Sequence, residues 1–499
     1  MRVVLLSTSD LAGGAARAAF RLMQGLRALD HDCSMLVRQK LSTDKDVHPV
    51  VFDEGAAASR REREAGRIRQ YCIERNRTAI SNTWFSLPAP GYDLSHHEKI
   101  QSADILHLHW VSQLLSPPGI ARLQDLGKPP IVWTLHDQRP FTGGCHFSAG
   151  CQRYETDCKA CPQLRRTDFG LTEASLDESR ECIGRNVVVA CPSRWMSDCA
   201  QRSSLFKGTR IVVIPGGVDT NVFKPRRAQA RKELGLDPTS VYLLAGADYG
   251  EEQRKGFHLL REAVRLNLAQ PGFRDAVAAK RIRFLVFGHA SPWAGIDLPT
   301  LALGRLDSEP ALAKVYAASD AFLLPSLEDN LPNTMLESVC SGTPVIGFAI
   351  GGLPDVIESG KNGLLVPAGD AGALARAIQD VATNPELRHN LASGCEAQAG
   401  SRFGLREQAK RYEQLYKELR PSGQASHHGS ADIPVRQAAP QEAEDRNVRA
   451  PTQPASVQPL APFGRSYATV YPRLLKYAKA ERSKKRWSKL SRLLRFGQA

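Results

Sequence analysis

The chain has 499 residues, too many for one typical domain of about 100–200 residues, so it should contain at least two. Hydrophobic residues make up 42% and charged residues 24%, which is ordinary for a globular protein and excludes a chain that is disordered throughout. The net charge of +14 is uneven. Residues 461–499 hold six Arg, five Lys and one acid, a sum of +10, so the other 460 residues carry only +4.

The sequence predicts neither a membrane span nor an export signal. No apolar run approaches the roughly 18 residues of a spanning helix. The apolar start at 1–8 is short for a signal peptide and is typical of a buried strand. The chain has eleven cysteines, an odd number. Together these features predict a reducing, cytoplasmic setting, in which disulfides are rare.

The first part of the chain alternates between short apolar runs and helical segments. An apolar run at 3–6 leads through a turn at 9–14 into a helix that carries Ala18, Leu22 and Leu26. Strands alternating with helices predict a parallel sheet covered on both faces. Further strands are expected at 33–37, 105–106, 131–135, 187–189 and 211–214.

The same alternation begins again near residue 240, so the expected fold class is α/β with two Rossmann-like, doubly wound parallel sheets. Its strands are predicted at 241–245, 283–287, 321–324 and 344–348, with a helix at 257–266 and a hinge at 214–219. The predicted domains are 1–210, with a Cys-rich insertion at 141–164, and 211–395, followed by a helix packing back at 396–420, a disordered linker at 421–460 and a basic amphipathic tail at 461–499.

The segment 325–337 is the most informative for function. A strand ends near Leu324 and a helix begins around Pro332, because proline suits the first turn of a helix. The N–H groups of that turn are unpaired and the helix dipole is positive there, so a diphosphate would bind well. Asp329 and Glu337 suit hydroxyls at two ends of a polyol ligand. On spacing alone, a helix cap and a solvated glutamate explain these acids equally well.

Together with 340–345 and 360–366, this segment resembles the donor-binding half of glycosyltransferase family 4, whose members are retaining enzymes of the two-domain GT-B architecture. The resemblance spans residues 1 to about 420. The family signature is two acids with seven residues between them, which Asp329 and Glu337 match, although the first family acid is usually glutamate. The resemblance implies that Glu337 binds the ribose of a nucleotide sugar and Asp329 the donor sugar. It also assigns their neighbours to the donor site: Asn330, Leu331, Asn333 and Thr334.

A basic turn at 253–257 matches the place where this family binds the donor diphosphate. The resemblance implies that Lys255 and Arg254 stabilise the charge that develops on the leaving phosphate. Arg254 is expected to substitute for an arginine that the family often carries a few residues earlier, where this chain has Ala247 and Asp248. The alternative is an exposed basic turn, which most Arg-Lys pairs are.

Two first-domain features fit the same family. Gly13 and Gly14 lie in the turn after the first strand, and the resemblance implies that this loop faces the donor phosphate across the cleft. His136 follows a strand and matches a family histidine near the reacting sugar; His107 and His109 share the same sheet edge. Taken alone, a Gly-Gly pair is usually a turn and a lone histidine is more often structural.

Four cysteines fall within 17 residues with the spacing C-x5-C-x6-C-x2-C. They would suit a tetrahedral structural zinc, with four unmetallated thiols as an equally good alternative and disulfides least expected. The surrounding segment 133–164 resembles a family 4 subgroup that builds exopolysaccharides of the colanic-acid type. Such a zinc would have no open position and would not be catalytic. The four residues are Cys145, Cys151, Cys158 and Cys161.

The basic end of the chain predicts an amphipathic helix from Pro472 to about Phe496. Trp487, Leu490 and Leu494 fall on one side of it among Lys and Arg, which favours an anionic membrane surface as the partner of 471–499. Nonspecific binding to RNA needs the same charges and is less favoured, and a solvated disordered end is the third alternative.

The sequence therefore indicates a retaining hexosyltransferase without a catalytic metal. It would move a sugar from a nucleoside-diphosphate sugar to a glycan or lipid-linked acceptor in polysaccharide biosynthesis, in the cytoplasm or on the inner face of the membrane. His136, Lys255 and Asp329 are the expected catalytic residues. A nucleotide-sugar epimerase of related fold, and a non-catalytic protein that docks on membrane or nucleic acid, remain alternatives.

Overall fold

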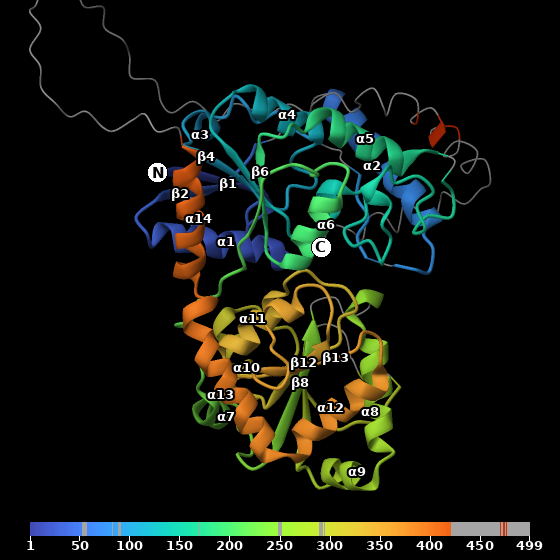
Figure 1. The fold of residues 1–499 in the computed structure, drawn as a ribbon, viewed down its shortest axis with the longest axis vertical. Helices are drawn as coiled ribbons and strands as arrows, with labels where there is room; N and C mark the ends of the chain where they lie inside the picture. Colours follow the sequence, from blue (N-terminus) through green and yellow to red (C-terminus); the bar gives the residue numbers. More distant parts are fainter. Residues whose placement is uncertain are drawn as a thin grey trace, which may run out of the picture.

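Two parallel β-sheets, each covered by helices on both faces, form two domains that lie one above the other in Figure 1. The computed structural model describes residues 1–420, except 52–56, 82, 88–90, 168, 248–251, 289–292 and 294, and also residues 470, 473, 474 and 476. Among the described residues, no helix is long and apolar enough to cross a membrane.

The first sheet has seven strands in the order β3-β2-β1-β4-β5-β6-β7, all paired in parallel. Its central strands are buried along their whole length, as expected for Val-, Ile- and Leu-rich strands covered on both faces. The strands are β1 (Arg2–Ser9), β2 (Asp32–Gln39), β3 (Val47–Pro49), β4 (Ile105–Leu108), β5 (Ile131–Thr134), β6 (Val187–Cys191) and β7 (Ile211–Val213). The helices are α1 (Gly13–Arg27), α2 (Ala57–Asn76), α3 (Glu98–Gln101), α4 (Pro117–Asp125), α5 (Leu171–Cys182) and α6 (Arg194–Arg202).

The second sheet has six strands in the order β10-β9-β8-β11-β12-β13, again all parallel. The strands are β8 (Val241–Ala247), β9 (Ile282–Gly288), β10 (Thr300–Ala302), β11 (Ala321–Leu324), β12 (Val345–Phe348) and β13 (Gly363–Val366). The helices are α7 (Arg227–Glu233), α8 (Phe257–Leu268), α9 (Pro271–Ala278), α10 (Glu309–Ala318), α11 (Asn333–Cys340), α12 (Ala371–Thr383), α13 (Pro385–Arg402) and α14 (Leu405–Leu419).

The strand order of each sheet reverses beside its first strand, between β1 and β4 and between β8 and β11. Ligands of such sheets bind outside the carboxyl ends of the strands at this point. The loops that follow β1, β4, β8 and β11 border these two points, and the loop after β5 lies beside them on the same edge of the first sheet. These two doubly wound parallel sheets confirm the fold class predicted from the sequence.

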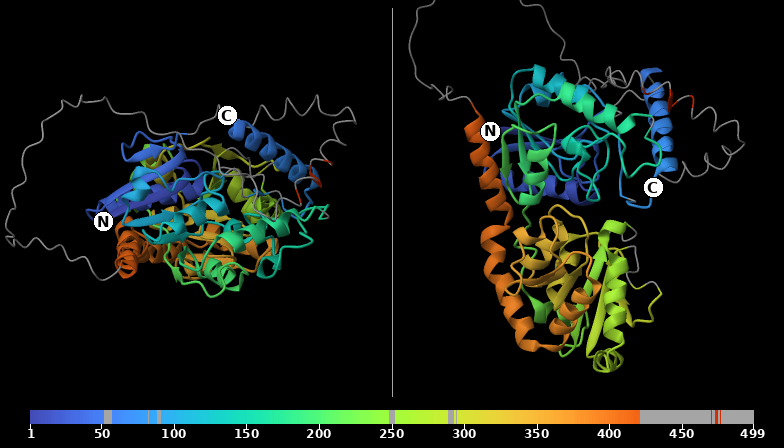
Figure 2. Two further views of the ribbon diagram at one scale, coloured as in Figure 1. Left: turned by 90° about the horizontal axis from the view of Figure 1, so that it is seen from above. Right: turned by 45° about the vertical axis from the view of Figure 1, so that its right-hand side comes forward.

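The chain returns to the first domain through α13 and α14, which run along one side of both domains in Figure 2. The sequence predicted one helix over 396–420. Its bounds were wrong, because α13 begins at Pro385 and the helix breaks at Phe403 and Gly404, but α14 packs back on α1 of the first domain as predicted. At the break, Val218 of the predicted hinge at 214–219 donates its N–H to the Phe403 carbonyl (2.8 Å) and accepts from the Leu405 N–H (3.1 Å). The break therefore joins the two segments that cross between the domains.

The predicted linker at 421–460 and almost all of the predicted tail lie outside the described residues, including the apolar stripe at 487–494. Val470 and Leu474 belong to the tail and are described. Both are buried in a cluster of first-domain residues that contains Ile68, Cys72 and Phe85. At these two positions the tail packs on the protein's own surface.

Candidate active site

Asn330 ties the loop after β11 to the first domain. Its Nδ2 donates to the carbonyls of Leu135 (2.9 Å) and His136 (3.1 Å), and its Oδ1 accepts from the Ser193 hydroxyl (2.6 Å). Only 4% of Asn330 is exposed. Because both ends of this buried amide are satisfied by the facing domain, the loop is held against the carboxyl edge of the first sheet.

Asp329 lies next to Asn330 and is paired with the predicted basic residues. Its Oδ2 is 2.8 Å from Lys255 Nζ and 3.3 Å from Arg254 Nη1, while Oδ1 accepts the Asn330 N–H at 3.2 Å. Burial alone would raise the pKa of the Asp329 carboxyl, but Lys255 and Arg254 outweigh it and hold that pKa below its usual value. The group is therefore ionised at neutral pH, and the sequence-predicted acid and bases form one cluster.

The position of the two basic residues depends on Gly256. Lys255 ends a single turn of 3-10 helix, and Gly256 follows with φ +67°. A Cβ atom at Gly256 would lie 1.8 Å from the Pro325 carbonyl oxygen at the end of β11. Arg254 also lies over the Phe147 ring of the first domain, with its guanidinium carbon 4.2 Å from the ring centroid. Only glycine lets this turn approach β11 closely enough to place its cations on Asp329.

Glu337 lies on α11 and is paired with an arginine that the sequence analysis missed. Arg21 of α1 donates from Nη2 to Glu337 Oε1 (2.7 Å) and from Nε to Glu309 Oε1 (2.8 Å). The side chain of Arg21 is 1% exposed and that of Glu337 is 4% exposed. Glu337, the residue expected to bind the ribose, is thus paired with Arg21, a buried cation of the facing domain. A charged residue among the apolar positions of the first helix was the available signal.

The glycine turn of the first domain lies across from the start of α11. Gly13 has φ +84°, which permits the tight entry into α1, and the Gly14 carbonyl accepts from Asn333 Nδ2 at 2.9 Å. Neither α1 nor α11 has a side-chain cap among the described residues, so their first N–H groups are available to an anion. Leu331 and Thr334 flank this contact and are partly buried.

The histidines of the first sheet form a buried chain. His107 bonds Tyr416 of α14 through Nδ1 (2.7 Å) and Thr134 through Nε2 (2.7 Å), which makes it a structural residue. His109 Nδ1 lies 3.0 Å from His136 Nε2 at the sheet edge. Burial lowers the pKa of His107 to about 3 and that of His136 to about 4, so both are neutral near pH 7.

The Cys-rich segment contacts the second domain through Glu328. This carboxylate accepts the Ala149 N–H at Oε2 (2.9 Å) and the Ser148 hydroxyl at Oε1 (3.3 Å), and burial raises its pKa. Ser148 and Ala149 stand between the first two cysteines of the cluster. The segment predicted as an insertion therefore lies directly on the loop that carries Asp329.

The four cysteines of this segment line one small cavity, together with Phe85 and Gly143. Within the described part of the chain, however, no group of three or more His, Cys, Asp or Glu side chains is arranged to hold a metal ion. Burial raises the pKa of the Cys158 thiol to about 12 and that of Cys145 well above its usual value. The Cys145 and Cys158 thiols are therefore protonated, and the four side chains are not arranged as a metal site in the described part of the chain. The predicted zinc stays a prediction.

Two family models match the chain. Residues 12–222 match the model described as Glycosyltransferase Family 4, and residues 240–384 match Glycosyl transferases group 1. A D-inositol 3-phosphate glycosyltransferase of Actinosynnema mirum is 30% identical over 254 residues, which cover 46% of this chain and 59% of that protein. One from Pseudarthrobacter chlorophenolicus is 28% identical over 58% of this chain and 64% of that protein. The chain spans about half the length of the curated relatives it matches.

Solved structures agree in fold. Sucrose-phosphate synthase from Thermosynechococcus elongatus has a TM-score of 0.58 at 20% identity, covering 84% of this chain and 98% of its own. Anabaena HepE, in complex with UDP and glucose, has a TM-score of 0.55 at 15% identity, covering 84% and 100%. The chain therefore has the two-domain GT-B fold, and its two domains coincide with the two matched segments.

Proposed function

We propose that the protein is a retaining glycosyltransferase that moves a sugar from a nucleoside-diphosphate sugar to a glycan or lipid-linked acceptor. The observation that carries this proposal is the cluster of Asp329, Lys255 and Arg254 beside the uncapped start of α11, opposite the Gly13–Gly14 turn. An acid for sugar hydroxyls and cations for a diphosphate then stand at one switch point between two glycosyltransferase domains.

Lys255 and Arg254 would stabilise the leaving group. The bond between the anomeric carbon and the diphosphate oxygen breaks, and the negative charge that develops on this oxygen lies beside the two cations and the N–H groups of α11. The acceptor hydroxyl attacks from the same face and passes its proton to the departing phosphate, so configuration is retained. Loss of one preorganised stabiliser of this kind costs about 3 kcal/mol of transition-state stabilisation.

Asp329 and His136 would bind the donor sugar. Asp329 is ionised and accepts hydrogen bonds from hydroxyls, while a neutral His136 hydrogen-bonds a hydroxyl without placing a second charge in the site. Glu337 would receive the ribose together with Arg21, whose Nη1 is buried without a hydrogen-bond partner in the described part of the chain. A ribose oxygen would satisfy that N–H group.

Three finer features belong to the same proposal. The acceptor would be an exopolysaccharide precursor of the colanic-acid type, the tail would attach the enzyme to an anionic membrane, and the cysteine cluster would close around one structural zinc after a small local rearrangement. The support for these is the resemblance of 133–164, the charge of 461–499 and the common cavity of the four thiols. Metal analysis of the purified protein and binding to anionic vesicles test the last two.

Thermal unfolding with UDP-, GDP- and ADP-sugars tests the donor site. A donor at 100 times its Kd should add about 2.7 kcal/mol of stability. We expect one nucleotide to shift the wild type and Lys207→Gln, an exposed first-domain control, but not Glu337→Ala or Lys255→Gln. Absence of any shift would contradict donor binding.

The product distinguishes transfer from the alternatives. With the donor that binds, retained anomeric configuration of the transferred sugar in NMR spectra would support the proposal. An epimerised sugar on the same nucleotide, formed without acceptor, would instead identify an epimerase. If the donor binds but neither a transferred nor an epimerised sugar forms, the result would favour the non-catalytic alternative.

A further inference from the structure

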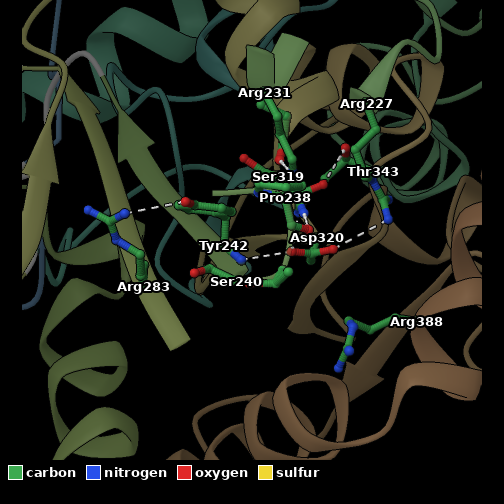
Figure 3. Close-up of polar contacts among 12 residues, drawn as sticks. Arg227, Arg231, Pro238, Ser240, Tyr242, Arg283, Ser319, Asp320, Thr343 and Arg388 are labelled. Carbon is green, nitrogen blue, oxygen red and sulfur yellow. Dashed lines mark hydrogen bonds and ion pairs between the residues drawn. The ribbon is translucent and has the colours of Figure 1, made fainter. Parts of the chain in front are cut away.

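A cationic cavity lies in the second domain, at the sheet edge opposite the candidate active site. It has a volume of about 740 Å³ and is bounded by the start of α7, the residues before β8 and β11, and α13 (Figure 3). Asp320 precedes β11 here, whereas Asp329 follows it at the other end. The cavity is therefore separate from the donor site.

Its lining is unevenly charged. Four arginines face it against two acids, Asp320 and Glu396, which leaves an excess of two positive charges. We call this site the arginine cavity. Its four arginines are Arg226, Arg227, Arg231 and Arg388.

Arg231 and Asp320 form the fixed floor of this cavity. Arg231 donates from Nη2 to Asp320 Oδ2 (2.6 Å), from Nε to the Ala318 carbonyl (3.0 Å) and from Nη1 to the Pro238 carbonyl (2.9 Å). Asp320 also accepts the Tyr242 N–H at 2.7 Å, as Figure 3 shows. Because the hydrogen bonds of Arg231 and Asp320 are made within the protein, these two residues shape the cavity. The other three arginines would bind a ligand.

The other three arginines are less completely compensated. Arg227 reaches Asp320 Oδ1 through Nη1 at 3.3 Å, and its side chain is 34% exposed. Arg226 Nε is buried with no hydrogen-bond partner in the described part of the chain. Arg388 Nη1 donates to the carbonyls of Val381 (2.8 Å) and Ala382 (3.1 Å) at the end of α12. Burial lowers the pKa of Arg388, and Arg227 and Arg231 lower it further although Asp320 opposes them. An anion between these guanidinium groups would relieve their repulsion.

We propose that the arginine cavity binds a phosphate monoester. A dianion matches the excess of two positive charges, and planar guanidinium groups bind phosphate oxygens in bidentate fashion. The volume lies within the range of about 300–1,000 Å³ found for small-molecule sites. The phosphate is carried by a small soluble molecule or by a lipid head group, since both present the same chemistry.

Isothermal titration with glycerol 3-phosphate, in phosphate-free buffer of low ionic strength, tests the soluble source. Co-sedimentation with phosphatidylcholine vesicles, with and without phosphatidic acid, tests the lipid source. We expect saturable binding that weakens by about tenfold or more in Arg227→Gln and in Arg388→Gln. The matched control is Arg283→Gln, because Arg283 contacts the Tyr242 hydroxyl (3.4 Å) and does not line the cavity.

The Lys255→Gln variant tests whether glycerol 3-phosphate binds at the donor site instead. We expect this variant to bind glycerol 3-phosphate as the wild type does. Binding lost in Lys255→Gln but kept in Arg227→Gln would overturn the proposal, as would no binding of either probe. Binding to phosphatidic acid alone, if it depends on Arg227, would support it and identify the lipid source. Should Arg388→Gln fail to fold, Arg227→Gln decides, because its partly exposed side chain can be replaced without burying a new group.

Discussion

We expect loss of the Arg21 side-chain charge to lower the stability of the protein, because Arg21 joins the two domains through a buried ion pair. We consider Arg21→Met, which keeps an unbranched side chain of similar length over the Phe223 ring but removes the charge. The substitution leaves the buried Glu337 carboxylate without its cation and removes the cation that Glu309 contacts. Since Arg21 belongs to α1 and Glu337 to α11, one contact between the domains is lost as well.

The expected cost follows from the burial of the two acids. Breaking a buried ion pair by removing one partner costs about 3–5 kcal/mol, because the remaining charge is left uncompensated. The Glu309 side chain is 33% exposed, so its share is that of a surface pair, about 1 kcal/mol or less. For a cooperative unit of 150–250 residues, 1 kcal/mol shifts Tm by about 2–4 °C. The first unfolding transition should therefore fall by roughly 6–24 °C.

Differential scanning calorimetry measures this shift, and two further variants make the result specific. Arg17→Met is the control, because Arg17 lies one turn earlier on α1 and donates to the Leu11 carbonyl at 3.4 Å. In the double variant Arg21→Met/Glu337→Gln the uncompensated charge is gone, so its Tm should recover toward the wild type. The reasoning would be refuted by an Arg21→Met Tm within 2 °C of the wild type, or by a double variant no more stable than Arg21→Met.

Three further outcomes are expected. Gly256→Ala should lower kcat about 100-fold with the donor that binds, because a Cβ there meets the Pro325 carbonyl and displaces Lys255; activity equal to the wild type would contradict this. Asn330→Ala removes three interdomain hydrogen bonds of about 1 kcal/mol each, so its Tm in the same calorimetric scan should fall, and an unchanged Tm would count against the tie. The free energy of unfolding in urea should decrease as the pH falls from 7 to 5. The unfolded chain binds protons below its histidine pKa of about 6.5, whereas His107 and His136 in the folded chain take them up only near pH 3 and 4; a flat profile would refute this assignment.

The sheets could be predicted from the sequence because their strands are buried on both faces. Continuous apolar runs such as 131–135 and 321–324 indicate strands that are buried on both faces, and both runs form central strands. The short edge strand β10 was missed, since two of its three residues are exposed and no apolar run marks it. The helix predicted over 396–420 failed for a different reason. The pairing of Phe403 with Val218, which breaks it, depends on the fold rather than on helical periodicity.

The candidate site was predictable only within each domain. The spacing of Asp329 and Glu337, and the basic turn at Lys255, are local patterns that a single segment displays. Arg21 pairs with a residue 316 positions away, and its place among the apolar positions of α1 indicates burial but not which residue its side chain contacts. Contacts of this kind arise from how two folded domains face each other.

The donor loop is also the interface between the domains, and this limits what a donor-site substitution can prove. Glu328 contacts Ala149, Asn330 contacts His136, and Asn333 contacts Gly14, so neighbouring residues of one loop and helix start bind the first domain. A variant in this segment changes both the ligands of the donor and the closure of the cleft. Lys255 is different, because the polar contact of its side chain is with Asp329 of its own domain. Loss of turnover in Lys255→Gln with an unchanged Tm would therefore report on donor binding and leaving-group chemistry, whereas the same loss in Asn330→Ala would report equally on closure.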